Sequence, residues 1–214
     1  IKVSRMNESP SLLHVAPSDR KELARRALIA AATTMLQTTP ADQLNIVELT
    51  RQAGVSRPTL YRHYDNHPTL DRVAVLAKLQ ASFATALSPE TPSNWIPAAR
   101  TTIHQLLTEL HSESRFYLHA IQGPGGLQLI GDVIEFLDKR ILEDSPLAPV
   151  LRASSGEATA KDRTLFLSAG IAWLILQWLH TDFTGRNTID NTTDRILTHL
   201  LTVTGTETVE VPSP

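Results

Sequence analysis

The sequence contains no cysteine among its 214 residues. This absence excludes disulfide bonds and thiolate metal sites, and it fits the reducing cytoplasm that we predict as its location. The sequence also has no long hydrophobic run: the longest apolar stretch, Leu165 to Leu179, is about 15 residues long, contains Ser168 and Gln177, and is short for a bilayer span. The first residues show no basic-then-apolar signal pattern. We therefore predict a cytoplasmic protein with no membrane partner.

An excess of positive charge is also lacking, because the formal net charge is −2. Net charge alone therefore gives no indication of a nucleic-acid partner. Residues 18–72 hold eight Lys and Arg against six Asp and Glu, whereas the rest holds twelve against sixteen, which is a mild asymmetry. A hydrophobic content of 42% with 20% charged residues argues against global disorder and provides ample core for one large or two small domains.

The apolar residues recur at helical spacing along most of the chain, so we predict an all-α fold. Long loops are predicted at residues 88–93 and 146–160, which are rich in polar residues and proline. The helical segments are predicted near residues 19–37, 45–64 (two short helices), 68–87, 93–110, 116–121, 127–142, 165–181 and 190–203. The segment 165–181 is apolar nearly all round, and such a helix must be covered on every side.

Residues 45–64 predict a helix-turn-helix. Asn45 is suited to cap a first helix, with Glu48 completing a capping box. Gly54 falls where the chain must turn sharply. Ser56 is suited to cap a second helix, whose first turn accepts Pro58 without losing a hydrogen bond. Two short helices joined by a glycine-containing turn form the helix-turn-helix that DNA-binding proteins use.

This region resembles the tetracycline-repressor (TetR-like) family of bacterial transcription regulators. The resemblance covers residues 25–70, where the matching residues follow one another in the order of the family pattern. The C-terminal two-thirds of the chain matches only in its layout of helices. The sequence departs from the family pattern at Thr50, Asn45 and His67, which stand where Ala, Thr and Lys are common. The residues that carry the resemblance are Ala30-Ala31, Met35-Leu36, Ile46, Leu49, Ala53-Gly54-Val55-Ser56, Thr59-Leu60-Tyr61-Arg62-His63-Tyr64 and Leu70.

The resemblance implies a homodimer without a cofactor. It predicts a flexible arm at residues 1–17, a three-helix helix-turn-helix domain at 18–66, a larger helical effector-binding and dimerisation domain at 67–204, and a frayed tail at 205–214. The predicted function is a ligand-responsive regulator, a repressor as is most common in the family. Such a dimer binds a palindromic operator in double-stranded DNA and is released by a small, largely apolar effector. The alternative is a constitutive or protein-regulated DNA-binding dimer without an effector.

The predicted DNA contacts lie on the second helix of the motif and its flanks. Arg57 is suited to bind guanine in the major groove, and Pro58 to touch a thymine methyl group. Tyr61 and His63 resemble the phosphate-contacting pair of the family. Leu60 and Tyr64 are predicted to pack inward. The full predicted set is Asn45, Ser56, Arg57, Pro58, Thr59, Tyr61, Arg62, His63 and His67.

Two further sets are predicted in the second domain, where the aromatic residues concentrate. Pockets are mostly apolar with a few polar groups, which Tyr117, Gln122 and Gln177 would supply. The predicted pocket residues are Ile103, Leu107, Phe116, Tyr117, Gln122, Val133, Phe166, Trp173 and Gln177. An apolar helix shared between two chains would form a four-helix interface with the last helix, and the predicted interface residues are Leu174, Trp178, Ile196 and Leu200.

Neither a metal site nor an enzyme active site is predicted. His104, His111 and His119 follow one another at spacings of seven and eight residues, without a carboxylate–histidine cluster of ligand spacing. No nucleophile–base pairing or phosphate-binding loop accompanies them. The histidines are therefore interpreted as solvated or hydrogen-bonded residues at the edge of the core.

Overall fold

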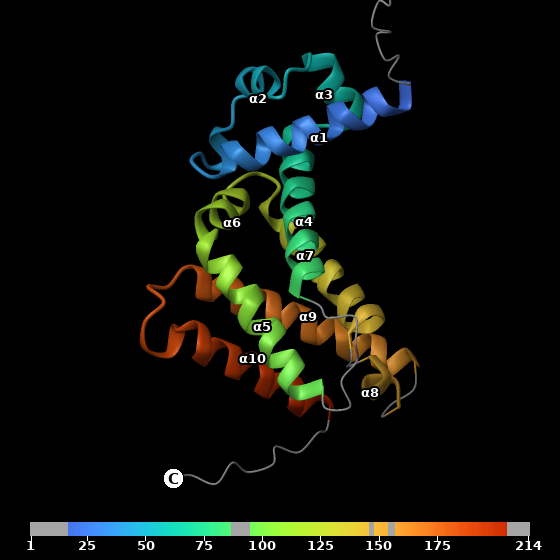
Figure 1. The fold of residues 1–214 in the computed structure, drawn as a ribbon, viewed down its shortest axis with the longest axis vertical. Coiled ribbons are helices and arrows are strands. Elements are labelled where there is room, and N and C mark those ends of the chain that lie inside the picture. The colour runs from blue at the N-terminus through green and yellow to red at the C-terminus, as the bar shows by residue number, and fades with distance from the viewer. Residues whose placement is uncertain (1–16, 87–94, 146–147, 154–156, 205–214) are drawn as a thin grey trace, which may run out of the picture.

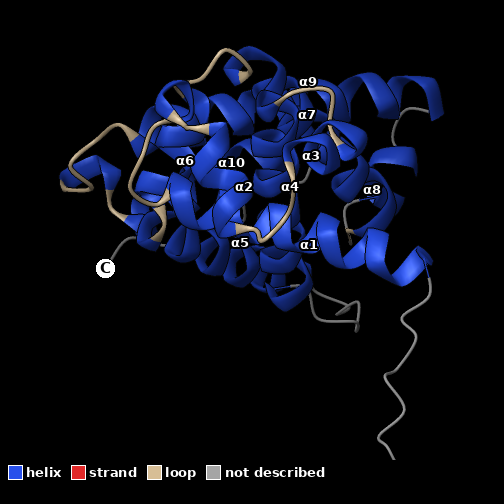
Figure 2. Ribbon diagram, turned by 90° about the horizontal axis from the view of Figure 1, so that it is seen from above, coloured by secondary structure: helices blue, strands red, loops and turns tan. Residues whose placement is uncertain are grey.

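The structure, a computed structural model, describes residues 17–86, 95–145, 148–153 and 157–204, and these residues contain helices and no strand (Figures 1 and 2). The predicted all-α class is therefore confirmed. Nearly all of the predicted arm, the predicted loop at 88–93 and the predicted tail at 205–214 lie outside the described residues.

The helices follow the predicted order closely. Three short turns of other geometry lie between them: η1 (Ala41–Gln43), the π-helical η2 (Arg140–Asp144) and η3 (Gly185–Asn187). The helices are α1 (Pro17–Leu36), α2 (Ile46–Gln52), α3 (Arg57–His63), α4 (His67–Ala86), α5 (Trp95–Ser112), α6 (Ser114–Ile121), α7 (Gly126–Lys139), α8 (Ala148–Ala153), α9 (Glu157–Leu179) and α10 (Ile189–Thr204).

Two clusters of buried apolar residues organise the molecule. The smaller cluster joins α1, α2 and α3 around Leu28, Leu49 and Leu60, and these helices form one end of the molecule, with α10 at the other (Figure 1). Helix α4 belongs to both clusters, since Leu70 lies in the smaller one and Leu79 in the larger. The domain boundary at residue 66 stays a prediction, and α4 is the continuous rod that joins the two units.

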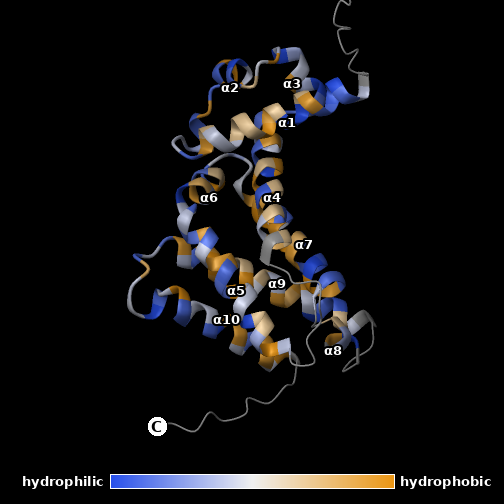
Figure 3. Ribbon diagram, in the orientation of Figure 1, coloured by the Kyte–Doolittle hydropathy of each residue, from blue (hydrophilic) through white to orange (hydrophobic). Residues whose placement is uncertain are grey.

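The larger cluster is built mainly from α4 to α10 and also contains Leu36 of α1, Ala41 of η1 and Leu44. Helix α9 packs against α7, α8 and α10, while α5 packs along α10. Figure 3 shows hydrophobic residues distributed along α4, α7 and α9, as expected for helices that contact neighbours on more than one side. Trp178 is the largest fully buried side chain, and its indole nitrogen donates to the carbonyl oxygen of Asn187 at 2.6 Å.

The predicted loop at 146–160 is wrong for the residues that the structure describes there. Residues 148–153 form α8, and α9 begins at Glu157. Ala148 and Leu151 of α8 and Ala160 of α9 are buried, so α8 is anchored to the core by two residues one turn apart and the start of α9 by Ala160. A single buried position per turn is too little for the periodicity of the sequence to indicate a helix.

Candidate nucleic-acid interface and ligand cavity

The helix-turn-helix is held by local capping bonds. The side chain of Asn45 accepts a hydrogen bond from the Val47 amide at 2.8 Å, and Ser56 accepts one from the Thr59 amide at 3.4 Å. Gly54 has a φ of +64°, a left-handed conformation that glycine adopts without cost. The predicted capping box is not formed, because Glu48 pairs with Arg51 rather than returning to Asn45.

Helix α3 presents a largely unpaired face to solvent. Arg57, Tyr61 and Arg62 are exposed, and no ion pair engages either arginine among the residues that the structure describes. The helix carries no acidic residue. Leu60 and Tyr64 are buried beneath it, as predicted. An exposed, cationic helix that follows a tight turn has the geometry with which such motifs enter the major groove.

The other predicted contact residues surround this face. Asn45, Ser56 and Pro58 are exposed, whereas Thr59 and His63 are half-buried. Burial lowers the pKa of the His63 imidazole, and the positive charges of Lys21 and Arg62 lower it further. The neighbouring cations therefore favour a neutral His63 that donates or accepts a hydrogen bond, rather than a charged one.

Thr50 is accommodated although a smaller residue is common there. Its side chain is buried, and its hydroxyl donates to the carbonyl oxygens of Ile46 at 2.9 Å and Val47 at 3.1 Å. These bonds satisfy the polar group inside α2, so burial of the threonine carries little penalty.

His67 differs from the rest of the predicted set. It begins α4 with its side chain largely buried, and its Nδ1 lies 3.4 Å from the carboxylate of the buried Asp71. Burial raises the pKa of Asp71 to about 6, and the hydrogen bond to His67 opposes this shift. His67 is thus oriented by a carboxylate of its own helix, and we leave it out of the proposed DNA interface.

Asp71 makes the stability of the protein depend on pH. Because the native carboxyl keeps its proton to a higher pH than the unfolded chain does, its contribution to stability is complete below about pH 4 and is lost as the pH rises to about 6. The Asp71→Asn variant cannot ionise. We expect it to exceed the wild type by about 3 kcal/mol in free energy of unfolding at pH 7 and to match it near pH 4.

Urea denaturation between pH 4 and pH 7 measures this difference. The exposed Asp65 provides a matched control, since Asp65→Asn removes a carboxylate that lies at the surface. Stability curves of Asp71→Asn and wild type that run parallel over the whole range would contradict the assignment.

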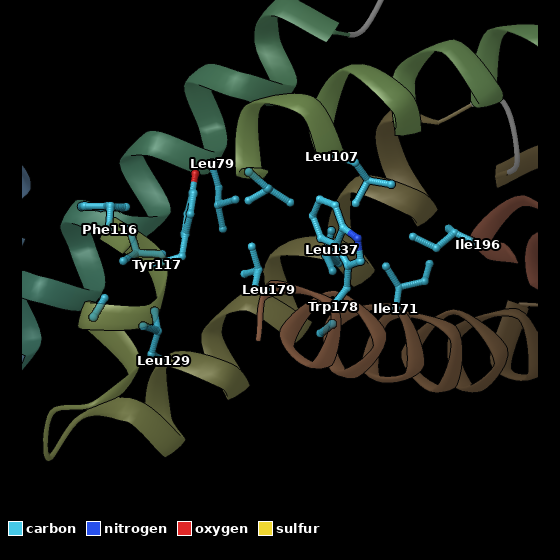
Figure 4. Packing of buried hydrophobic residues seen from close by; sticks show 14 of the residues in the cluster. Leu79, Leu107, Phe116, Tyr117, Leu129, Leu137, Ile171, Trp178, Leu179 and Ile196 are labelled. Atoms are coloured by element: carbon cyan, nitrogen blue, oxygen red, sulfur yellow. The ribbon is translucent and has the colours of Figure 1, made fainter. Parts of the chain in front are cut away.

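A large cavity lies within the second domain. Its volume is about 1090 Å³, and α4, α5, α6, α7, α9 and α10 all contribute to its wall. The wall is mainly aliphatic. Its polar groups come from α4 and α6 (Ser82 and Tyr117), from α5 (Thr101, Thr102 and Gln105) and from the π-helical turn and the residue after it (Arg140, Glu143, Asp144 and Ser145). A cavity of this size and character fits a drug-sized apolar molecule. Figure 4 shows several of the buried residues around it.

The structure brings four of the predicted pocket residues to the cavity wall: Ile103, Leu107, Tyr117 and Val133. The other five do not line it. Phe116 is buried in the core behind the wall, and Gln122, Phe166, Trp173 and Gln177 are exposed on the outside of the domain. Sequence reasoning missed Ser82, a polar residue within the apolar face of α4, although its position next to Phe83 was a signal.

The predicted interface residues also need correction. Trp178, Ile196 and Leu200 are buried in the core of their own chain, and Leu174 is only half-exposed. The exposed apolar residues of α9 are instead Leu165, Phe166 (78% exposed) and Trp173 (57% exposed). The predicted helix is thus kept as an interface candidate, but the face that is free for a partner is the opposite one.

The three histidines that invited a metal hypothesis have other partners. His104 lies 3.2 Å from the carboxylate of Asp190, and His119 lies 2.8 Å from the carbonyl oxygen of Leu36. His111 packs edge-on against Phe183 with ring centroids 4.3 Å apart. No group of three or more potential ligands with metal-binding geometry occurs in the described part of the chain.

Side chains from α4 and α6 tie the cavity domain to α1. Glu113, before α6, accepts a hydrogen bond from Gln37 at 2.6 Å and pairs with Lys78 of α4 at 3.3 Å. Arg72 of α4 forms a two-pronged ion pair with Asp132 of α7, with its shortest contact at 2.6 Å. These contacts join α4 and α6 to the end of α1 and to α7, so they form a continuous connection between the cavity domain and the helix-turn-helix unit.

Together, the exposed recognition helix and the hollow helical domain define a helix-turn-helix DNA-binding protein with a ligand-type cavity. Residues 28–67 match the family profile of the bacterial regulatory proteins of the tetR family. The match bears out the predicted family resemblance over these residues, which span the helix-turn-helix, so this part of the chain is similar to the DNA-binding region of those transcription regulators. No curated protein matches the sequence.

The solved structures that this chain is similar to include two regulators from Rhodococcus and one from Pseudomonas. A transcriptional regulator from Rhodococcus sp. RHA1 matches with a TM-score of 0.61 and 16% identity over 86% of this chain and 100% of its own. A second Rhodococcus regulator has a TM-score of 0.53 and 16% identity, over 83% of this chain and 96% of its own. NalD, the secondary repressor of the MexAB-OprM multidrug efflux pump in Pseudomonas aeruginosa, has a TM-score of 0.44 and 16% identity, over 87% of this chain and 96% of its own. In the described part of the chain, no helix has the length and apolarity to cross a membrane.

Proposed function

We propose that this protein is a repressor that binds a palindromic operator as a homodimer and is released by a largely apolar effector. The observation that carries the proposal is the continuity of α4, which packs in the helix-turn-helix core through Leu70 and lines the cavity through Leu79 and Ser82. One helix is therefore in contact with both the DNA-binding unit and the cavity that we propose for the effector.

The proposed DNA interface is the exposed face of α3 with the preceding turn. Arg57 lies at the helix N-terminus, where recognition helices contact base edges, and its guanidinium is suited to guanine O6 and N7. Tyr61 lies one turn further on, half exposed, and is suited to a phosphate. The remaining proposed contacts are Asn45, Ser56, Pro58, Thr59, Arg62 and His63.

The proposed dimer interface is the outward face of α9. Phe166, Gly170, Trp173 and Gln177 are all exposed and recur at spacings of three and four residues, so they form one stripe along the helix. Gly170 between two aromatic residues allows a second helix to approach closely. A twofold-related copy would cover this stripe and set the distance between its two recognition helices at about one turn of DNA.

Release of DNA follows from binding to one conformer. The effector needs only to bind one arrangement of α4 and α6 more tightly than the other. The arrangement that it favours is the one in which the recognition helices do not fit the operator. The Gln37–Glu113–Lys78 contacts would then carry the displacement to the C-terminal end of α1.

Substitutions on α3 test the DNA interface. We expect Arg57→Ala to lose about 1–3 kcal/mol of discrimination at each half-site, because the base-edge contact is removed. Tyr61→Phe should weaken binding to operator and to scrambled DNA by the same amount, about 0.5–1.5 kcal/mol, because a phosphate contact carries no sequence information. Fluorescence anisotropy measures both, with an operator selected from a random pool and a scrambled duplex.

Arg100→Ala serves as the control, since it removes an exposed arginine of α5 that pairs with Asp194. Unchanged operator affinity in both α3 variants would refute the interface. If the operator is bound but no apolar compound weakens that binding or raises the melting temperature, a constitutive binder replaces the effector-released repressor.

A further inference from the structure

A buried polar group lies at the α4–α6 side of the cavity. Tyr117 lines the cavity with 5% of its surface exposed, and its hydroxyl has no hydrogen-bond partner among the described residues. Figure 4 shows its ring beside Phe116, and the two rings pack edge-on with centroids 5.0 Å apart. The ring is thus fixed by packing. Its hydroxyl lies close enough to Ser82 for that side chain to oppose the rise in its pKa, but it makes no hydrogen bond of standard geometry within the described residues.

Two neighbours determine what this hydroxyl can meet. Ser82 is also buried in the cavity wall, and its hydroxyl lies 2.6 Å from a Glu109 oxygen, to which it donates. The Ser82 oxygen keeps lone pairs that can accept a bond. Burial raises the pKa of the Tyr117 phenol, and the charges of Glu109 and Glu113 raise it further. At neutral pH the phenol is therefore a donor.

Behind this part of the cavity wall, outside the lining itself, the summed charge of Lys78, Glu109 and Glu113 is negative. Lys78 is paired with Glu113 at 3.3 Å, whereas no ion pair involves Glu109 in the described part of the chain. An anionic group next to Tyr117 would be repelled by Glu109 in surroundings of low dielectric constant. At the π-helical turn, Arg140 and Asp144 are paired with each other at 2.6 Å, so their charges are already matched.

We infer that Tyr117 and Ser82 anchor a neutral oxygen, such as a phenol, alcohol or amide group, of an otherwise apolar effector, and that Glu109 excludes anionic ligands. The Tyr117 hydroxyl donates to the ligand oxygen, and a ligand hydroxyl or amide hydrogen is donated to Ser82. This inference rests on the proposed function, because it takes the cavity as the effector site. It also places the polar group of the effector between α4 and α6, the elements that contact α1.

Three probes of similar shape test the inference: 2-naphthol, naphthalene and 2-naphthoate, titrated calorimetrically into the full-length protein. For the wild type we expect 2-naphthol to bind and 2-naphthoate to bind at least about tenfold more weakly. The Tyr117→Phe variant, which removes only the hydroxyl, should weaken the binding of 2-naphthol about tenfold and leave the affinity for naphthalene unchanged. Glu109→Gln should reduce the difference in binding affinity between 2-naphthol and 2-naphthoate.

The outcomes separate the anchor from the proposed function. If the wild type binds 2-naphthoate as tightly as 2-naphthol, or if Tyr117→Phe weakens 2-naphthol and naphthalene equally, the anchor is refuted while the cavity remains a ligand site. The first of these comparisons needs no variant, so it holds even if Tyr117→Phe fails to fold. If none of the probes binds the wild type, while anisotropy still shows operator binding, the anchor fails and DNA binding stands. The effector-released function fails with the anchor only if no apolar compound weakens operator binding.

Discussion

Trp173→Arg is expected to convert the protein to a monomer and to weaken operator binding by about two orders of magnitude or more. Trp173 is 57% exposed at the centre of the α9 stripe, with Phe166 at 78% two turns before it. In a dimer, the substitution would bury an unpaired positive charge against its own copy, across a twofold axis. A monomer contacts one half-site at a time, so it loses the gain in affinity that joining two binding units provides.

Sedimentation velocity at micromolar concentration and operator anisotropy measure the two effects. Leu127→Arg is a matched control, because Leu127 is 80% exposed but lies on α7, outside the stripe. We expect Leu127→Arg to remain a dimer with wild-type operator affinity. A Trp173→Arg protein that remains a dimer and binds the operator normally would show that another surface joins the two chains.

The error over α9 shows what a helical sequence pattern leaves undetermined. The helix is apolar on almost every side, so its sequence predicts that all sides are covered without indicating which side meets its own core. Trp178 is 1% exposed because His111 of α5 and Phe183 lie against its ring and its indole nitrogen bonds to the carbonyl oxygen of Asn187. Trp173, five residues earlier, points the opposite way. Only the placement of the other helices distinguishes the two tryptophans.

The helix-turn-helix was predictable because its determinants are local. The caps at Asn45 and Ser56, the left-handed Gly54 and the inward Leu60 all act within a few residues of their own position. The ion pair between Arg72 and Asp132 spans 60 residues of sequence, and the Gln37–Glu113 bond spans 76. No spacing rule relates such residues, so the contacts that join the two units could not be found without the structure.

The residues of the cavity wall were predictable only in part. Aliphatic residues such as Ile103, Leu107 and Val133 were predicted from helical periodicity, which places them on inward faces. Exposed aromatic residues were predicted with them, because aromatic content alone does not separate a pocket wall from an outer surface. Ser82 and the π-helical turn were missed, since a single polar residue inside an apolar face resembles an ordinary exception.

Gly126→Ala is expected to destabilise the protein by about 3 kcal/mol or more. Gly126 is buried at the start of α7, and a Cβ added there would overlap the carbonyl oxygen of Ile121, the last residue of α6. Both sides of this clash are fixed by backbone, so no rotamer change can relieve it. The α6–α7 corner would have to open, and it positions Leu129 in the cavity wall.

Gly131 is the control, because it lies in the same helix, is exposed, and has nothing within 4 Å of an added Cβ. Gly131→Ala should stabilise the protein by about 0.5–1 kcal/mol, the usual gain when alanine replaces glycine inside a helix. Free energies of unfolding from urea titrations measure both changes. Opposite signs at two glycines of one helix would isolate the close approach of Ile121 as the cause, whereas equal stabilisation of both variants would show that the α6–α7 corner accommodates a side chain.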